Sequence, residues 1–246
     1  MTTTSSGGPV RRVERHPEHD LPRGSWPATL PAVRQLLDDG LDLAPGVTFL
    51  VGENGSGKST VVEAVAAAYG LNPEGGSTGA RHRTRASESP LGDVLRLVRS
   101  PGPLVSSYFL RAETMHSLFT YLEDNPSADV RGEPVFHEMS HGESFLAVLR
   151  TRFAGYGFFV LDEPEAALSF RSCLALVALL DDLRREGAQV LCATHSPLLA
   201  SLPGATLLEC GDHGLRESTY GELDLVQDWR DYLAAPDRYL RHLLAP

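Results

Sequence analysis

The chain has 246 residues, a formal net charge of −10 and 42% hydrophobic residues. This length allows one domain with a substantial core, and the acidic balance argues against a protein that coats nucleic acid non-specifically. No apolar stretch approaches the roughly 20 residues of a membrane-spanning helix. The three cysteines lack metal-ligand spacing, and no signal-like segment opens the chain. We therefore expect a cytoplasmic protein without direct membrane insertion.

The N-terminal part of the chain is predicted to lead into a buried strand. Residues 1–9 are rich in Thr, Ser and Gly and predict a disordered tail, so a single domain is expected over residues 10–246. A strand is expected around Val10 to Arg15, and a helix from Pro31 to Asp39. The β-branched and aromatic run from Val47 to Val51 is typical of a buried parallel strand.

A glycine-rich loop follows this strand and contains Lys58, the only lysine of the chain against 21 arginines. It matches the phosphate-binding pattern G-x-x-x-x-G-K-[ST]. The compact ammonium of Lys58 suits a narrow phosphate slot better than a guanidinium does, and the Ser59 hydroxyl is predicted to bind Mg²⁺. A helix from Ser59 to Tyr69 would direct its N-terminal N–H groups at the phosphates. The residues predicted to bind the ATP phosphates are Gly52, Asn54, Gly55, Ser56, Gly57, Lys58, Ser59 and Thr60.

A second buried strand, Gly157 to Leu161, ends in two acids, Asp162 and Glu163. Four hydrophobic residues followed by two acids form a Walker B pattern, and the carboxyl ends of parallel strands meet at one edge of a sheet. We predict that Asp162 holds Mg²⁺ and that Glu163 orients a water for attack on the γ-phosphate. Taken alone, the pair is equally well explained as solvated acids at a strand end.

Three further segments occur in a particular order around the Walker B pattern. They are Met139 to Ser144, Glu165 to Ser169, and Cys192 to Pro197. Together with the glycine-rich loop, they resemble the signature, D-loop and switch histidine of the ATP-binding-cassette (ABC) ATPases. The resemblance implies an α/β P-loop fold of the ABC type, with a central, mostly parallel sheet and a small helical insert at roughly residues 71–153.

Within that superfamily, the chain looks more like stand-alone ATPases related to RecF-like and SMC-type heads than like transporter subunits. A group of small bacterial predicted ATPases shares the runs Ser140 to Leu146 and Arg238 to Leu244. The resemblance implies Mg-dependent ATP hydrolysis by an ATP-driven dimerising switch. The alternatives are the nucleotide-binding subunit of an ABC membrane transporter and a nucleotide-binding regulator with little turnover, although Glu163 speaks against the regulator.

By resemblance, two copies bind head to tail and enclose two ATP molecules. Ser140, His141 and Gly142, at a helix N-terminus, would bind the γ-phosphate held by the other copy. His195, which follows the predicted strand Gln189 to Ala193, would contact the γ-phosphate as the switch histidine and is assigned a catalytic role with Lys58 and Glu163. The simpler interpretations are a helix N-cap at Ser140 and a structural histidine at a strand end.

The chain departs from the ABC pattern after the predicted strand from Pro103 to Leu110. ABC ATPases usually have a glutamine there that contacts Mg²⁺, whereas this chain has Arg111 and Glu113. Glu113 is the candidate replacement as an oxygen ligand of Mg²⁺, and Arg111 as a phosphate contact. The alternative is that both are solvated charges at the start of a helix, too close in sequence to pair with each other on its surface.

Possible partners are only weakly indicated. The segment from Arg81 to Arg85 is the densest positive cluster and is predicted to be a solvated loop, with contacts to ATP or to nucleic acid as the alternatives. No residue pattern identifies a protein partner. The C-terminal residues Tyr239, Leu240, Leu243 and Leu244 occur at helical spacing and are predicted to pack on the ATPase core.

Overall fold

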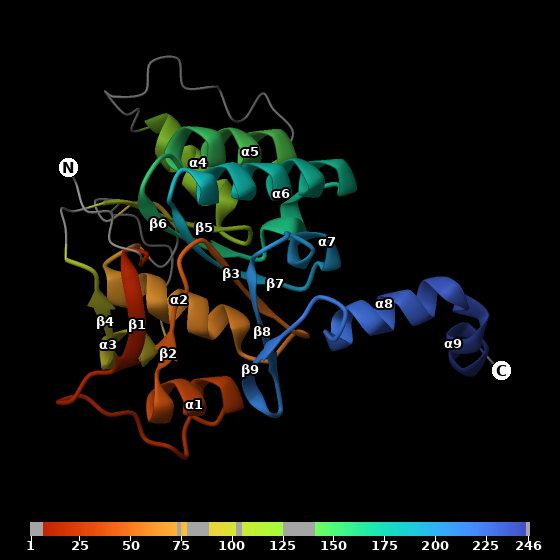
Figure 1. The fold of residues 1–246 in the computed structure, drawn as a ribbon, viewed down its shortest axis with the longest axis horizontal. Coiled ribbons are helices and arrows are strands. Elements are labelled where there is room, and N and C mark those ends of the chain that lie inside the picture. The colour runs from red at the N-terminus through yellow and green to blue at the C-terminus, as the bar shows by residue number, and fades with distance from the viewer. Residues whose placement is uncertain (1–6, 73–74, 78–88, 102–104, 125–140, 245–246) are drawn as a thin grey trace.

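The computed structural model describes residues 7–72, 75–77, 89–101, 105–124 and 141–244 (Figure 1). Within these ranges, six strands form a sheet in the order β5-β6-β7-β3-β8-β9. All neighbours in the sheet are parallel except β9, which is antiparallel to β8. This confirms the predicted α/β fold with a mostly parallel central sheet. The strands are β3 (Val47–Val51), β5 (Ser106–Arg111), β6 (Gly157–Asp162), β7 (Gln189–Thr194), β8 (Thr206–Gly211) and β9 (Gly214–Ser218).

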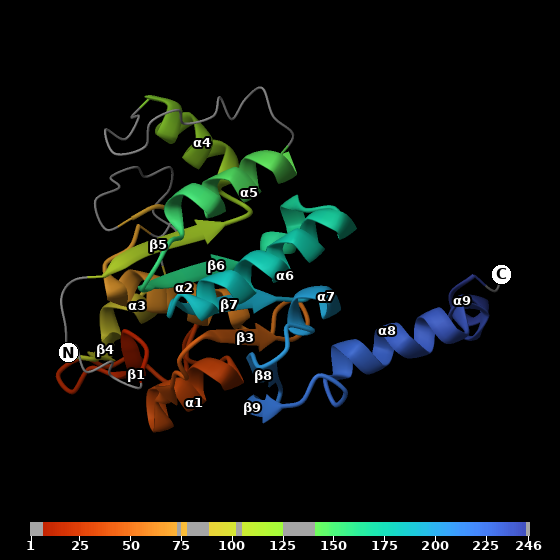
Figure 2. The same cartoon turned by 45° about the horizontal axis from the view of Figure 1, so that its top comes forward.

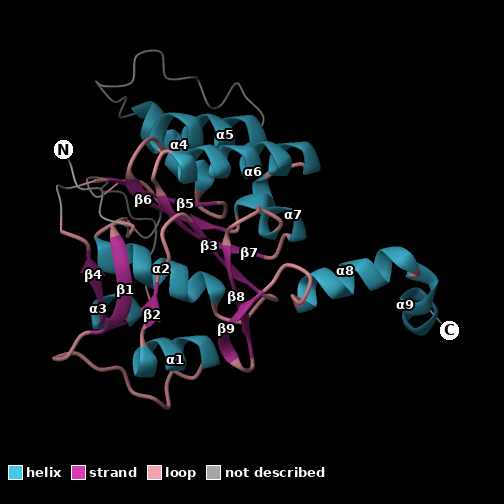
Figure 3. Cartoon of the chain, in the orientation of Figure 1, coloured by secondary structure: helices cyan, strands magenta, loops and turns pink. Residues whose placement is uncertain are grey.

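Helices cover both faces of this sheet (Figures 1 and 3). In β3, Phe49 belongs to one hydrophobic core and Leu50 to the other, because alternate side chains of a strand point to opposite faces. None of the described helices is long and apolar enough to cross a membrane. The first core includes residues of α4 (Met115–Asp124), α5 (His141–Arg152), α6 (Phe170–Arg185) and α7 (Pro197–Ala200), and the second those of α1 (Pro31–Asp39), α2 (Lys58–Tyr69) and α3 (Leu91–Val94).

A small antiparallel sheet in the order β2-β1-β4 accompanies α1 and α2; its strands are β2 (Leu41–Asp42), β1 (Val10–Arg15) and β4 (Leu95–Arg99). The residues that precede β1 are held by this region. Gly8 and Pro9 are buried, and the Ser100 hydroxyl donates to the Gly8 carbonyl at 2.7 Å. The prediction of a disordered tail over residues 1–9 is therefore wrong at Gly8 and Pro9, and residues 1–6 lie outside the described part of the chain.

The span predicted as a helical insert contains strands as well as helices. Besides α3, α4 and α5, it includes β4 of the small sheet and β5 at the edge of the central sheet. The reason is topological: because the edge strand β5 pairs in parallel with β6, the chain must return along the sheet between them, and α4 and α5 lie in this crossover.

The buried side chain of Gln189, which is 1% exposed, ties the small sheet to the central one. Its amide accepts a hydrogen bond from Val10 N at 2.9 Å and donates to the carbonyls of Val10 and Ala44 at 2.8 and 2.9 Å. These three bonds give partners to backbone groups that are shielded from water and would otherwise lack a hydrogen bond.

Replacing Gln189 with alanine is expected to lower the free energy of unfolding by about 3 kcal/mol, because three backbone groups lose their partners at about 1 kcal/mol each. Urea denaturation measures the change. Gln227→Ala is the matched control, because the Gln227 side chain is exposed and donates only to the Gly221 carbonyl, and it should change the value by less than about 0.5 kcal/mol. Equal midpoints for the two variants would contradict this role.

The C-terminal helices α8 (Asp224–Ala234) and α9 (Pro236–Leu243) extend away from the central sheet and its helices (Figures 1 and 2). Tyr239, Leu243 and Leu244 are 41%, 76% and 73% exposed, so the prediction that this stripe packs on the ATPase core is wrong. The chain turns at Ala235, and Tyr239 instead meets Tyr232 of α8 edge-on, with ring centroids 5.7 Å apart. Helical spacing defines an apolar face but does not select what covers it.

The cysteines are part of the core. Cys173, Cys192 and Cys210 are all buried and free. Burial raises the pKa of each thiol, to about 12 for Cys210, so all three remain neutral and serve as small apolar side chains.

Candidate functional site

Four neighbouring strands bring the predicted site residues to one edge of the central sheet. In the strand register, Val51 lies opposite Thr194, Asp162 opposite Ala193, and Arg111 opposite Asp162. The glycine-rich loop, the two acids, the histidine segment and Arg111 all follow or end these strands. Because the strands are parallel, their carboxyl ends share an edge, which is where α/β proteins commonly bind ligands.

The glycine-rich loop closes tightly around Lys58. Gly57 precedes α2 with φ of +97°, a backbone conformation that residues with a Cβ rarely adopt. Gly52 passes so close to β8 that a Cβ there would lie 2.3 Å from the Cys210 carbonyl oxygen. Lys58 is only 2% exposed, and its ammonium donates to the Glu53 carbonyl at 2.8 Å. The loop therefore holds one buried cation at the N-terminus of a helix.

Asp162 is buried beside the start of α2. The Ser59 hydroxyl lies close enough to its carboxylate to stabilise the charged form. Burial raises the pKa of Asp162, and Arg111, Ser59 and Lys58 oppose that rise by stabilising the charged form. Among the described residues, Asp162 Oδ1 is a buried oxygen without a hydrogen-bond partner.

This donor set fits Mg²⁺. A carboxylate with a free lone pair and an adjacent hydroxyl offer the hard oxygen ligands that Mg²⁺ takes, and such sites commonly use few protein ligands together with substrate phosphates. The described residues contain no group of three or more His, Cys, Asp or Glu side chains that could hold a metal ion by themselves.

Glu163 has an unusual backbone conformation directly after β6. Among the described residues other than glycine, it alone has a positive φ, +46°. Its N–H donates to the Ala193 carbonyl at 3.0 Å. Its Oε1 lies 3.9 Å from Lys58 Nζ and 3.8 Å from His195 Nδ1. The left-handed conformation costs roughly 1 kcal/mol and directs the carboxylate between the lysine and the histidine.

The side chain of Glu165 holds the histidine segment in place, a role that sequence reasoning missed. Its buried Oε1 accepts hydrogen bonds from Thr194 Oγ1 at 2.6 Å and from the His195 N–H at 2.7 Å. Thr194 Oγ1 in turn accepts from the Ser196 N–H at 3.0 Å. The available signal was a third acid, two residues after Glu163 and inside the predicted D-loop, but only the fold shows that its side chain is buried beside β7.

Arg111 makes three ion pairs at this edge. Its guanidinium nitrogens lie 3.2 Å from a Glu63 oxygen, 3.1 Å from a Glu113 oxygen and 3.2 Å from Asp162 Oδ2. The alternative that Arg111 and Glu113 are too close in sequence to pair is wrong, because Arg111 ends β5 and Glu113 lies in the turn before α4, so neither is on a helix. Glu63 was missed, although it follows Ser59 by four residues and so shares its helix face.

Cavities flank both sides of the glycine-rich loop. One, of about 550 Å³, is lined by Ser59, Arg111, Ala112, Glu113, Asp162, Glu163, Ala166 and Ala167. The other, of about 700 Å³, runs from the loop to α8, and its lining includes Glu53, Glu209, Asp212, Asp224 and Asp228. Gly52, Asn54, Gly55 and Ser56 of the glycine-rich loop also line this second cavity, together with these acids. The first combines acids with the Arg111 cation and the Ser59 hydroxyl.

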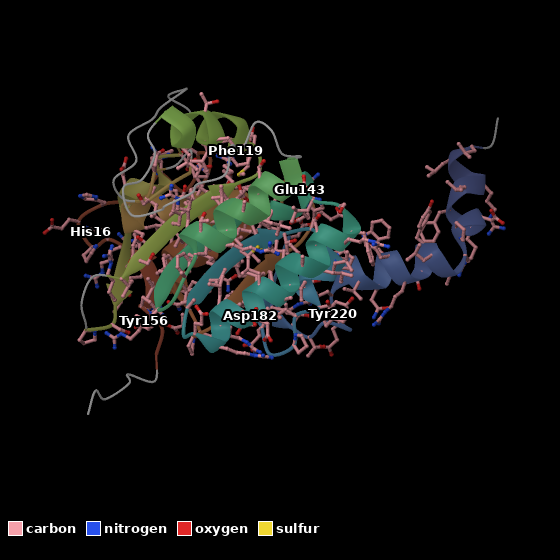
Figure 4. All side chains as sticks on the ribbon, turned by 90° about the horizontal axis from the view of Figure 1, so that it is seen from above. His16, Phe119, Glu143, Tyr156, Asp182 and Tyr220 are labelled. Atoms are coloured by element: carbon pink, nitrogen blue, oxygen red, sulfur yellow. The ribbon has the colours of Figure 1, made fainter. Side chains whose placement is uncertain are left out.

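The residues predicted to act across a dimer are only partly described. Ser140 lies outside the described residues, as does the segment from Arg81 to Arg85. The helix α5 begins at His141, and Glu143 lies in its first turn (Figure 4). A Cβ on Gly142 would lie 3.3 Å from the Ala167 carbonyl oxygen, so this helix start adjoins the predicted D-loop. In the described part of the chain, Gly142 lines neither cavity.

Two family descriptions match separate parts of the chain. Residues 30–93, which include the glycine-rich loop, match “AAA domain”. Residues 135–201, which run from the predicted signature to the histidine segment, match “AAA domain, putative AbiEii toxin, Type IV TA system”.

Curated relatives and a solved structure extend this comparison. The chain is 29% identical to the ribose import ATP-binding protein RbsA of Jannaschia sp. over 68% of its own length and 36% of that protein, so it spans about a third of this relative. It is 29% identical to the cytochrome c biogenesis ATP-binding export protein CcmA of Maricaulis maris, over 72% of the chain and 85% of that protein. The fold matches that of a metal-chelate type ABC transporter in an inward-facing conformation, with TM-score 0.51, 14% identity, and 87% and 84% of the two chains covered.

Proposed function

Because this chain is a P-loop ATPase of the ABC type, we propose that it hydrolyses Mg·ATP in a site completed by a second copy. One observation carries the proposal. A buried lysine, a buried aspartate with a free oxygen and a glutamate held in a left-handed conformation meet beside one cavity.

In this proposal, the residues of the glycine-rich loop bind the phosphates. Lys58 exchanges its bond to the Glu53 carbonyl for one to phosphate oxygens, and the N–H groups from Asn54 to Thr60 supply the remaining donors. Ser59 and Asp162 hold Mg²⁺, which neutralises phosphate charge when bound. The role of Glu113 as a further ligand is proposed on its place in the cavity lining.

Glu163 orients the attacking water and accepts its proton. Its carboxylate lies within 4 Å of both Lys58 and His195, so it can hold a water between them and the γ-phosphate. His195 contacts the γ-phosphate, and Glu165 positions it through the His195 backbone N–H. Ser140, His141 and Gly142 act on the nucleotide of the other copy, a role supported by the start of α5 at His141.

We assign the protein to the RecF-like and SMC-like switches, as a cytoplasmic head-to-tail homodimer open to a protein partner. The three buried, free cysteines support a reducing compartment. A nucleic-acid partner has weaker support. The alternative, a transporter subunit, is favoured by the printed names of the import and export relatives. Arg111 in place of the usual glutamine opposes it, and co-purification with a membrane protein would support it.

A multiple-turnover assay of phosphate release tests the proposed function. Release is expected to saturate with ATP, to require Mg²⁺ and to stop on addition of EDTA, because Asp162 and Ser59 act through the metal. Activity per subunit should fall on dilution below the dimer dissociation constant. Tight ATP binding with less than one phosphate released per subunit would instead identify a nucleotide-binding regulator.

A further inference from the structure

Beside Asp162, the predicted metal ligand, the guanidinium of Arg111 forms ion pairs with three carboxylates, those of Glu63, Glu113 and Asp162 itself. Arg111 and Asp162 end adjacent strands in register, and Glu63 shares a helix face with Ser59. The Arg111 side chain is 20% exposed and that of Asp162 is 5% exposed. Water therefore screens this pair less than a surface ion pair, and the interaction is correspondingly stronger.

The guanidinium of Arg111 beside Asp162 opposes the binding of a second cation, Mg²⁺, to this carboxylate. Arg111 Nε lies 3.2 Å from Asp162 Oδ2, and Ser59 also stabilises the charged form of this carboxylate. A divalent ion on the same carboxylate would lie within a few ångströms of the guanidinium, where like charges repel strongly. The uncharged glutamine usual at this place in ABC ATPases would not compete in this way.

We propose that Arg111 competes with Mg²⁺ for Asp162 in the nucleotide-free protein, because its guanidinium lies against Oδ2 while only Oδ1 is free, and that Mg·ATP must weaken this ion pair to bind. The proposal rests on the proposed ATPase function. Glu63 gives the guanidinium a partner that it keeps when Asp162 turns to the metal. Arg111 is then a positioning residue that sets the magnesium requirement and prevents the metal from binding without nucleotide.

The first test uses no nucleotide. Arg111→Gln removes the cation beside Asp162, so about 10 mM MgCl₂ is expected to raise its Tm by at least about 3 °C. MgCl₂ should change the Tm by less than about 1 °C in three comparison proteins: wild type, Arg111→Lys, which keeps the charge, and the exposed control Arg150→Gln. NaCl equalises the ionic strength of the samples. An equal shift in Arg111→Gln and wild type would overturn the proposal.

The second test titrates Mg²⁺ while a fluorescent, non-hydrolysable ATP analogue binds. The half-saturating Mg²⁺ concentration should fall at least about tenfold in Arg111→Gln, as expected for loss of a close competing charge. It should rise in Glu63→Gln, because Arg111 loses another partner and stays on Asp162. If Arg111 is instead a phosphate contact, Arg111→Gln weakens analogue binding without lowering the Mg²⁺ requirement, and the proposal fails.

The two tests separate the inference from the proposed function. A wild-type protein that binds no analogue at any Mg²⁺ concentration would contradict the proposed function. The nucleotide-free measurement on Arg111→Gln would still decide whether the guanidinium excludes metal from Asp162. If Arg111→Gln does not fold, Glu63→Gln still tests the proposal, because it retains Arg111 and should raise the half-saturating Mg²⁺ concentration. An unchanged Mg²⁺ requirement in Glu63→Gln would count against the proposal.

Discussion

Lys58→Ala is expected to weaken ATP binding at least about 100-fold while leaving the fold intact. Loss of one partner of a buried, charge-assisted interaction commonly costs about 3 kcal/mol or more, which corresponds to this factor. The ammonium donates only to one carbonyl of an exposed loop residue, Glu53, which water can satisfy in the variant. Stability should therefore change little.

Isothermal calorimetry with Mg·ATP measures this loss, and circular dichroism checks the fold. Arg150→Ala, a cation removed from the exposed face of α5, serves as the control and should bind ATP as wild type does. Tight binding by a folded Lys58→Ala protein would remove the basis for the site, because no second lysine exists to replace it.

Glu163→Gln is expected to reduce turnover at least about 100-fold and to trap an ATP-bound dimer. Glutamine keeps the size and one acceptor oxygen but does not accept a proton from water, and general bases contribute about 10²- to 10⁴-fold. ATP binding should survive, since Lys58 and Asp162 remain. The dimer then persists because the step that releases it is blocked.

Light scattering with and without Mg·ATP detects the trapped species as a shift from monomer to dimer. Glu217→Gln, on the exposed face of β9, is the matched control and should hydrolyse ATP and return to monomer. An unchanged monomer that still binds ATP would count against the homodimer and would indicate that a different subunit completes the site. Undiminished turnover would show that Glu163 is not the base.

Local chemistry made much of the fold predictable. The bounds of α1 and β3 agree with the sequence prediction, because Pro31 and Gly40 mark the helix ends and a run of five buried residues, four of them apolar, defines the strand. The parallel order of β3, β6 and β7 then places the glycine-rich loop beside Asp162 and Glu163. Pattern reasoning failed at Gly8, Pro9 and α9, where burial depends on segments distant in sequence.

The sequence by itself determined the phosphate loop, the acidic pair and the histidine after β7, because each depends on turn chemistry and residue type over a few positions. Only the tertiary structure decided that Glu165 holds the His195 segment and that Arg111 joins Glu63, Glu113 and Asp162. These contacts depend on strand register, helix phase and burial, which bring together residues up to about a hundred positions apart. Ion pairs of this kind therefore cannot be predicted until the arrangement of the strands in the sheet is known.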